Sequence, residues 1–146
     1  MAGQQTSHTE QSNAQLVVAI TARALFHLED GHQLFEAQGI EAYSKFQRDR
    51  ENELLNPGIA FPLVEKLLAL NVGAPNEKPR VEVILLSRNS SDTGLRIFNS
   101  IEHFGLKITR AVFTSGAEVY PYIKPFGAHL FLSANPDSVR SALEHG

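Results

Sequence analysis

The strongest constraint on this chain is the alternation of short apolar runs with helical stretches. Residues 16–20 and 81–86 are runs rich in Val, Ile and Leu, too short for helices, and they predict strands buried on both faces. Residues 108–113 and 129–132 are predicted to form a third and a fourth strand. Strands that alternate with helices predict an α/β fold, a Rossmann-like parallel sheet with helices on both faces.

The intervening segments carry helix signals. Between residues 31 and 52 apolar side chains recur at helical intervals, and Gly39 predicts a break between two helices. A helix is expected to begin near Pro62, another to span residues 92–104, and a last one to follow Asn135 as its N-cap. The helical period predicts one apolar stripe on the helix over residues 92–104, formed by Leu95, Phe98 and Ile101 and flanked by Ile97 and Phe104. In the last helix Val139, Ala142 and Leu143 are expected to face the sheet.

Length and composition describe one domain with a polar tail. The 146 residues are 42% hydrophobic, and the absence of cysteine excludes disulfides, thiolate metal sites and cysteine nucleophiles. Residues 1–15 lack any hydrophobic period, so we expect a disordered tail followed by a domain over residues 16–146. No apolar run approaches the ~20 residues of a membrane span, and the start does not resemble a signal peptide, so we expect a cytoplasmic protein with no membrane partner.

Charge argues against a nucleic-acid partner. The formal net charge is -3, and the 13 basic residues are scattered along the chain. Proteins that hold phosphate backbones cluster Lys and Arg on one face, because the release of counterions drives their binding. We therefore expect no nucleic-acid partner.

The carboxyl ends of parallel strands are where a ligand crevice is expected. Ser87, Arg88 and Asn89 follow the second predicted strand and offer a hydroxyl, a cation and an amide, while Lys124 precedes the fourth strand. These four residues are our candidates for binding phosphate or a nucleotide. The alternatives are that Ser87 is a polar loop residue bonded to its own backbone and that Lys124 is an exposed structural lysine.

Other candidate groups are weaker. The six histidines include no pair at i, i+4 spacing, and we interpret Glu29 and Asp30 as acids at the start of a helix. The aromatic series that includes Phe35 and Tyr43 is interpreted as core or interface in preference to a base-stacking platform. Arg23 lies just beyond the first strand and is a candidate to hold an anion or to pair with a neighbouring half of the protein.

Four stretches of the chain, taken in order, resemble the amino-terminal half of the cytosolic 5'-nucleotidase type I family, which belongs to the haloacid dehalogenase-like phosphohydrolases. The resemblance extends from Leu16 to Gly146. The stretches are Ala19-Ile20-Thr21-Ala22-Arg23-Ala24-Leu25-Phe26, Asn56-Pro57-Gly58-Ile59-Ala60-Phe61-Pro62, Ile97-Phe98-Asn99-Ser100-Ile101-Glu102-His103-Phe104 and His129-Leu130-Phe131-Leu132-Ser133-Ala134.

The resemblance implies a duplicated protein whose second half carries the catalytic aspartates. In this chain Ile20 stands where the aspartate nucleophile would be and Ala22 where the general acid and base would be, while Ser133 and Ala134 replace the metal-binding acids. Only Ser87 and Lys124 match the phosphohydrolase pattern in kind. No metal ligand and no catalytic residue is therefore assigned to this chain.

Two hypotheses follow from the resemblance. In the first, the whole protein is a Mg²⁺-dependent 5'-nucleotidase that hydrolyses nucleoside 5'-monophosphates to nucleoside and phosphate, and this chain is its degenerate first half. In the second, the chain is a non-catalytic nucleotide- or phosphate-binding or dimerisation module. Catalysis within this half would need Glu29, Asp30 or Asp92 to reach the crevice. Because Gly146 would release the chain toward a further strand, we expect a second half or a homo-oligomer to complete the sheet.

Overall fold

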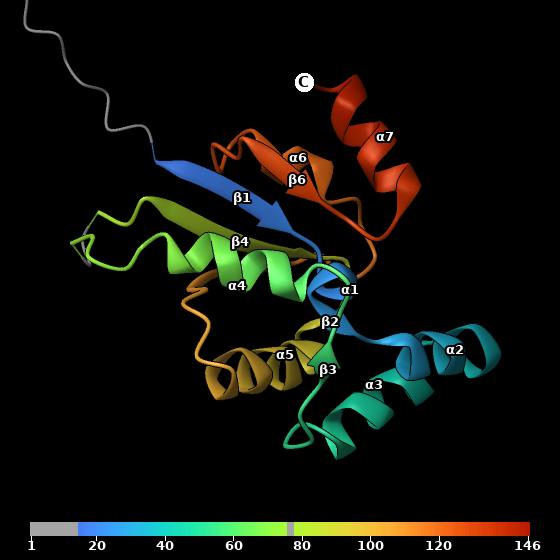
Figure 1. The fold of residues 1–146 in the computed structure, drawn as a ribbon. Helices are drawn as coiled ribbons and strands as arrows, with labels where there is room; N and C mark the ends of the chain where they lie inside the picture. Colours follow the sequence, from blue (N-terminus) through green and yellow to red (C-terminus); the bar gives the residue numbers. More distant parts are fainter. Residues whose placement is uncertain (1–14, 76–77) are drawn as a thin grey trace, which may run out of the picture.

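The predicted parallel sheet is present in the computed structural model, which describes residues 15–75 and 78–146. Strand β1 (Leu16–Ile20) lies between β4 (Val81–Ser87) and β6 (Leu130–Leu132), and β5 (Arg110–Phe113) pairs with β4. All three pairings are parallel and give the order β5-β4-β1-β6 (Figure 1). The α/β, Rossmann-like prediction is confirmed, whereas the predicted tail lies outside the described residues apart from Gln15.

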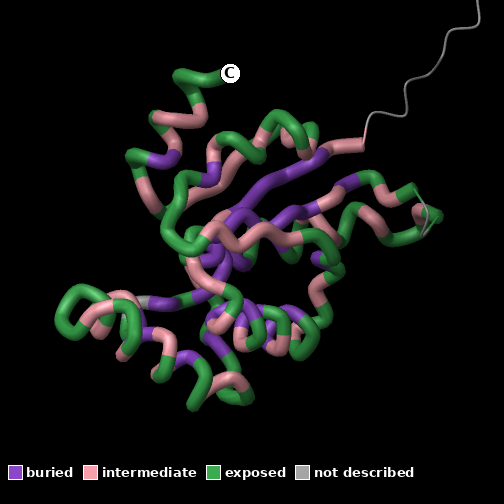
Figure 2. Tube along the Cα trace, turned by 180° about the vertical axis from the view of Figure 1, so that it is seen from behind, coloured by how far each residue is buried: buried purple, intermediate pink, exposed green. Residues whose placement is uncertain are grey.

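Both faces of the sheet are buried, as apolar runs without alternation require. On one face Val18 and Ile20 pack with residues of α4 (Phe61–Ala69) and α5 (Ser91–His103). On the other, Val17 and Ala19 pack with Val119, which precedes α6 (Tyr120–Ile123), and with Ile123. Figure 2 shows the buried residues concentrated along the strands at the centre of the molecule.

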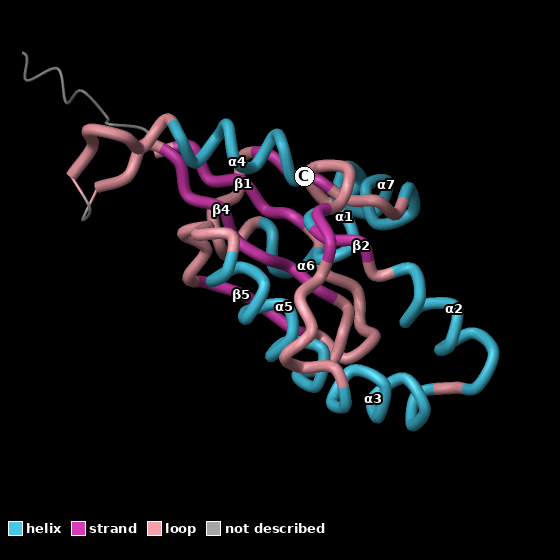
Figure 3. The backbone as a smooth tube through the Cα atoms, turned by 60° about the horizontal axis from the view of Figure 1, so that its bottom comes forward, coloured by secondary structure: helices cyan, strands magenta, loops and turns pink. Residues whose placement is uncertain are grey.

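The segment between β1 and α4 makes an excursion beyond the carboxyl end of the sheet. The single turn α1 (Ala22–Leu25) leads into β2 (Phe26–His27), which pairs antiparallel with β3 (Asn56–Pro57). Between these two short strands the chain forms a pair of helices, α2 (Glu29–Gln38) and α3 (Ile40–Asp49), hereafter the helical hairpin. Figure 3 shows that the hairpin projects past the sheet, with α3 alongside the end of α5.

Two glycines are required by this excursion. Gly39 joins α2 to α3 with a φ of 86°, which favours glycine and confirms the predicted break. Gly58 follows β3 where the chain passes so close to α1 that a Cβ would lie 2.8 Å from the carbonyl oxygen of Ala24. The amide of Gly58 also donates a 2.8 Å hydrogen bond to the carbonyl of Leu25, so the base of the hairpin is fixed through backbone contacts to α1, the turn that follows β1.

The remaining helices begin where the sequence indicated, although three side chains of the predicted stripes are exposed. Asn135 caps α7 (Pro136–Glu144) by accepting hydrogen bonds from the amides of Asp137 and Ser138. Leu143 of that helix is 78% exposed, however, and Leu95 and Phe98 of α5 are 57% and 37% exposed. The core side of α5 is formed by Ile101, which belongs to the predicted stripe, and by Ile97, which flanks it. Within the described residues no helix is long and apolar enough to cross a membrane.

Candidate functional site

The main cavity of the described structure lies at the carboxyl edge of the sheet and encloses about 460 Å³. This volume falls within the range of roughly 300–1,000 Å³ that is usual for small-molecule sites. Each strand of the sheet contributes lining residues from the segment that directly follows it. These residues are Thr21 after β1, Arg88, Asn89 and Ser90 after β4, Ser115 and Gly116 after β5, and Ser133 and Asn135 after β6.

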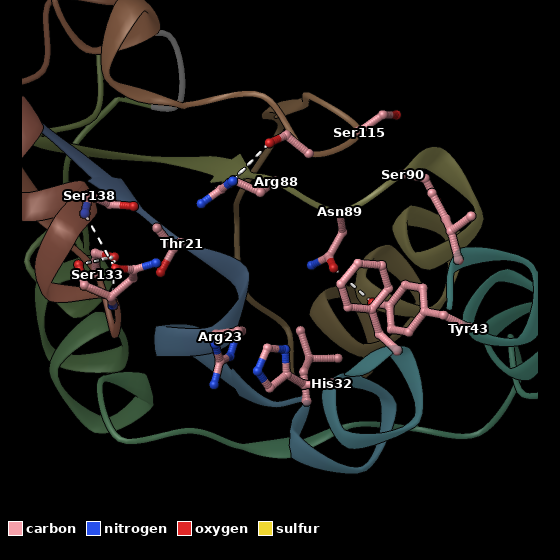
Figure 4. Close-up of a pocket in the computed structure, with 15 residues that line it drawn as sticks. Thr21, Arg23, His32, Tyr43, Arg88, Asn89, Ser90, Ser115, Ser133 and Ser138 are labelled. Carbon is pink, nitrogen blue, oxygen red and sulfur yellow. Dashed lines mark hydrogen bonds between the residues drawn. The ribbon is translucent and has the colours of Figure 1, made fainter. Parts of the chain in front are cut away.

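The topology explains why a crevice forms at this edge. The chain passes from β1 to β4 and β5 on one side, and then returns to β6 on the other side of β1. The connections after β1 and β6 therefore diverge, which leaves the open position where ligands bind in doubly wound sheets. Figure 4 shows Thr21 and Ser133 together on one side of this opening and Arg88 above it.

The helical hairpin forms the opposite wall of the cavity, and this wall is largely apolar. Leu28, Phe35, Ile40 and Tyr43 line it, together with His32, whose Nε2 lies 3.1 Å from a carboxylate oxygen of Glu36. Leu28 and Tyr43 are buried, whereas Phe35 and Ile40 are 45% and 59% exposed. The cavity thus joins a polar side made by the strand ends to an apolar side made by the hairpin.

Tyr43 fastens the hairpin to the loop after β4. Its hydroxyl donates a 2.7 Å hydrogen bond to Oδ1 of Asn89 and accepts one of 3.0 Å from the hydroxyl of Thr93. Burial raises the pKa of Tyr43, against a smaller opposing effect of the hydrogen bond from Thr93. The phenol is therefore neutral near pH 7 and acts as a donor to Asn89.

The four candidate phosphate-binding residues occupy three different environments. Arg88 and Asn89 line the cavity. Ser87 is 1% exposed, and its hydroxyl accepts hydrogen bonds from the backbone and side-chain amides of Asn89 at 3.1 and 3.0 Å. Lys124 is exposed at the C-cap of α6 and is not among the lining residues. The structure therefore brings Ser87, Arg88 and Asn89 together and leaves Lys124 outside the cavity.

Arg88 is held at the cavity by its neighbours. Its guanidinium donates to the carbonyl of Gly116, with the shorter distance 2.9 Å, and lies 3.5 Å from a carboxylate oxygen of Glu118. The side chain is 45% exposed, so it remains within reach of solvent and of a ligand. These contacts orient the guanidinium without removing it from the opening.

Two hydroxyl groups at the cavity have no hydrogen-bond partner among the described residues. The side-chain oxygens of Thr21 and Ser90 each expose less than 1 Å² and find no partner in residues 15–75 and 78–146, although both residues line the cavity. A buried polar group left unpaired costs roughly 1–3 kcal/mol, so such groups call for an explanation. A ligand or ordered water that enters the cavity would satisfy them.

Carboxylates are missing from the lining as the described residues define it. The cavity has two arginines, Arg23 and Arg88, but no Asp or Glu. Ile20 and Ala22, the two positions at which the resemblance led us to look for catalytic acids, are 0% and 1% exposed in the apolar core. Asp92 is committed elsewhere, since one of its carboxylate oxygens lies 3.4 Å from the guanidinium of Arg48.

The donor set does not fit Mg²⁺. This ion binds through hard oxygen ligands, chiefly carboxylates. In the described part of the chain no group of three or more His, Asp or Glu side chains could hold a metal ion. We therefore assign no chemical step of this chain to a metal.

A second cavity lies under the hairpin but is too small for a nucleotide. It encloses about 100 Å³ and is lined by Gln47 and Arg96, among others. The guanidinium of Arg96 donates to the side-chain oxygen of Gln47 at 3.2 Å and to the carbonyl of Glu53 at 2.8 Å. Burial lowers the pKa of Arg96. These contacts link α3 to α5 and stabilise the base of the hairpin.

Sequence reasoning overlooked part of the site. Thr21 and Ser90 have no distinguishing local pattern, because single hydroxyl residues in loops are common. The helical spacing of Phe35 matches that of buried residues and so predicts core or interface. The signal that could have identified these residues is their position, directly after a strand or on a helix that must cross the strand ends.

Comparison with known proteins relates nearly the whole chain to 5'-nucleotidases. A family profile described as 5'-nucleotidase matches residues 8–146 of the chain. Human cytosolic 5'-nucleotidase 1B is 32% identical over 135 residues, which are 90% of this chain and 22% of that protein. The chain thus spans about a fifth of the length of this curated relative. No solved structure matches the chain significantly.

Proposed function

This chain belongs to the 5'-nucleotidase family, and from that premise we propose that it is the half of a nucleotidase that lacks the aspartate nucleophile. The whole protein would hydrolyse nucleoside 5'-monophosphates to nucleosides and phosphate. This chain would be the first half of a duplicated, haloacid dehalogenase-like enzyme. Its contribution would be a nucleotide-binding cavity that does not turn its ligand over.

The observation that carries this proposal is a cavity at the right edge of the sheet with cations and hydroxyls but no described carboxylate in its lining. Phosphoryl transfer in this architecture requires an acidic nucleophile and a proton donor beside the phosphorus atom. The apolar side chains of Ile20 and Ala22 supply neither. Hydrolysis would therefore depend on acids from another part of the protein.

Binding of a phosphate monoester is supported by the same lining. The guanidinium of Arg88 and the unpaired hydroxyl of Thr21 can both donate hydrogen bonds to phosphoryl oxygens. We propose that Arg88 contacts the phosphate and that Ser87 acts indirectly, by orienting Asn89. Lys124 remains a candidate that would approach from the end of α6.

The proposal also covers the metal ion, the partner and the cellular location of the complete enzyme. Mg²⁺ would be required by the complete enzyme, with ligands outside this cavity. The partner that supplies the acids would be a second phosphohydrolase-like half or another copy of the chain. A cytoplasmic location would agree with the name of the human relative.

The experiment is a phosphate-release assay on the purified chain. AMP and IMP are supplied with Mg²⁺, human cytosolic 5'-nucleotidase 1B serves as the positive control, and the Lys124→Ala variant is assayed in parallel. We expect no release above background from either form of the chain. Release that Lys124→Ala abolishes would overturn the proposal, because it would demonstrate a working phosphohydrolase site within this chain.

The alternative is a binding or dimerisation module without a catalytic partner half. The positively lined cavity favours it as much as it favours the first proposal. The coding sequence downstream distinguishes the two. A continuing frame with an Asp-x-Asp pattern after a strand supports the nucleotidase half, and a stop codon after Gly146 supports the module.

A further inference from the structure

Phe35 is in an unusual position for a phenylalanine. It is 45% exposed, yet it lines the main cavity, where its ring meets that of Tyr43 edge to face with 6.0 Å between centroids. Ile40, from the start of α3, adds a side chain that is 59% exposed to the same wall. Together these two side chains form an accessible apolar surface, hereafter the Phe35–Ile40 wall, supported from behind by the buried Tyr43.

The wall is fixed relative to the polar side of the cavity. Tyr43 is bonded to Asn89 and Thr93, and the carbonyl of Glu51, just beyond α3, accepts a 2.9 Å hydrogen bond from the side chain of Asn99 on α5. These contacts hold α3 against α5 and against the loop after β4. A surface that is already in place loses little conformational entropy when a ligand arrives.

The two sides of the cavity match the two ends of a nucleotide. An aromatic ring beside an aliphatic side chain accepts the flat face of a nucleobase, because stacking needs only a π-face and apolar contact. Arg88 and the unpaired hydroxyls of Thr21 and Ser90 offer hydrogen bonds and charge to a phosphate and a sugar. In Figure 4 Thr21 lies across the opening from Tyr43, so a group suited to the phosphate and the aromatic side suited to the base are separated in space.

We propose that the Phe35–Ile40 wall binds the nucleobase, so that a nucleoside monophosphate lies with its base on Phe35 and its phosphate toward Arg88 and Thr21. This inference rests on the proposed nucleotide-binding function and adds the orientation of the ligand. It assigns the helical hairpin a role in recognition: the hairpin contributes affinity for the base, whereas the strand ends contribute affinity for the phosphate.

The chain contains no tryptophan, which allows a direct optical test. In a Phe35→Trp variant all indole fluorescence comes from the wall. We expect AMP to quench it through stacking and ribose 5-phosphate, which has no base, to leave it unchanged. Phe46→Trp is the matched control, because Phe46 lies on the same hairpin but lines the smaller cavity and not the main one, and its fluorescence should not respond to AMP.

Calorimetric titration of the natural chain provides an independent readout. We expect AMP to bind about tenfold more tightly than ribose 5-phosphate, the order of magnitude that base–aromatic stacking contributes. Phe35→Leu keeps an apolar side chain but removes the ring, so it should bring AMP to nearly the affinity of ribose 5-phosphate. Phe46→Leu should retain the tenfold difference.

The outcomes separate this inference from the function on which it rests. Equal affinity of the natural chain for AMP and ribose 5-phosphate would overturn the base-binding role and leave phosphate binding intact. The base-binding role would also be overturned if the tenfold preference for AMP over ribose 5-phosphate persisted in Phe35→Leu, or if Phe46→Leu lost it to the same extent. If neither ligand binds at millimolar concentration, the proposed nucleotide-binding function fails, and the inference fails with it.

Discussion

Replacement of Tyr43 by Phe removes one oxygen atom from the junction between the hairpin and the sheet. The hydroxyl of Thr93, which is 0% exposed, then loses the oxygen to which it donates at 3.0 Å. Oδ1 of Asn89 loses a 2.7 Å hydrogen bond but lines the cavity, where water can replace it. Leaving the buried hydroxyl of Thr93 unpaired costs about 1–3 kcal/mol, whereas Asn89 can replace its lost hydrogen bond with one from water at little cost. We therefore expect the free energy of unfolding to fall by about 2 kcal/mol.

Urea unfolding followed by far-ultraviolet circular dichroism measures this change, because single domains of this size usually unfold in one step. With a slope of about 2 kcal/mol per molar urea, the midpoint should fall by about 1 M. Tyr122→Phe is the matched control. Tyr122 is 39% exposed, and its substitution should change the free energy of unfolding by less than about 0.5 kcal/mol.

A double-mutant cycle tests the reason for the loss. In Tyr43→Phe with Thr93→Val, both partners become apolar and no hydroxyl is left unpaired between them. The double variant should therefore be more stable than the sum of the single losses predicts, by about 1 kcal/mol. Simple additivity, or a Tyr43→Phe variant as stable as the natural chain, would refute the argument that this hydroxyl fastens the hairpin.

Four further predictions concern the fold and its pH dependence. Gly58→Ala should destabilise the chain by several kcal/mol or prevent folding, since its Cβ would approach backbone atoms to 2.8–2.9 Å; the soluble yield and the urea midpoint measure this. Asn135→Ala should cost about 1 kcal/mol through loss of the α7 cap, again by urea unfolding. Ser100→Ala should cost about 1–3 kcal/mol, because the buried amide of Leu55 would lose its acceptor at 2.9 Å, and hydrogen exchange at that amide should accelerate. The folded-state pKa of Tyr43 is raised, so the stability that depends on its neutral phenol is complete below pH 10 and is lost as the pH rises further. Between pH 10 and higher pH, the free energy of unfolding should therefore fall less in Tyr43→Phe than in the natural chain, as urea unfolding at each pH would measure.

The sequence determined the elements of the sheet closely, for local reasons. The run Leu16–Ile20 became β1 with the same bounds, because five apolar residues rich in β-branched side chains fit a strand buried on both faces. Gly39 marked the break between two helices, since its positive φ is a property of the residue itself. Asn135 marked the start of α7 for a similar reason: its side chain reaches amides only two and three residues away.

Contacts between distant segments were beyond the reach of local patterns. The pairing of β2 with β3 joins residues about 30 positions apart, and neither two-residue strand has a pattern of its own. The exposure of Leu95 and Leu143 depended on which stripe of each helix met the sheet. Helical period gives a side of the helix only approximately, and packing chooses between neighbouring stripes.

The candidate site shows the same division between what local sequence patterns determined and what the tertiary structure decided. The strand pattern was enough to place a crevice at the carboxyl edge, and it brought Ser87, Arg88 and Asn89 to that edge because they directly follow a strand. Only the tertiary structure decided that Ser87 turns inward to Asn89, that Lys124 stays outside, and that Phe35 lines the cavity. Backbone conformation follows from neighbours along the chain, whereas the surroundings of a side chain are set by segments that meet only after the chain has folded.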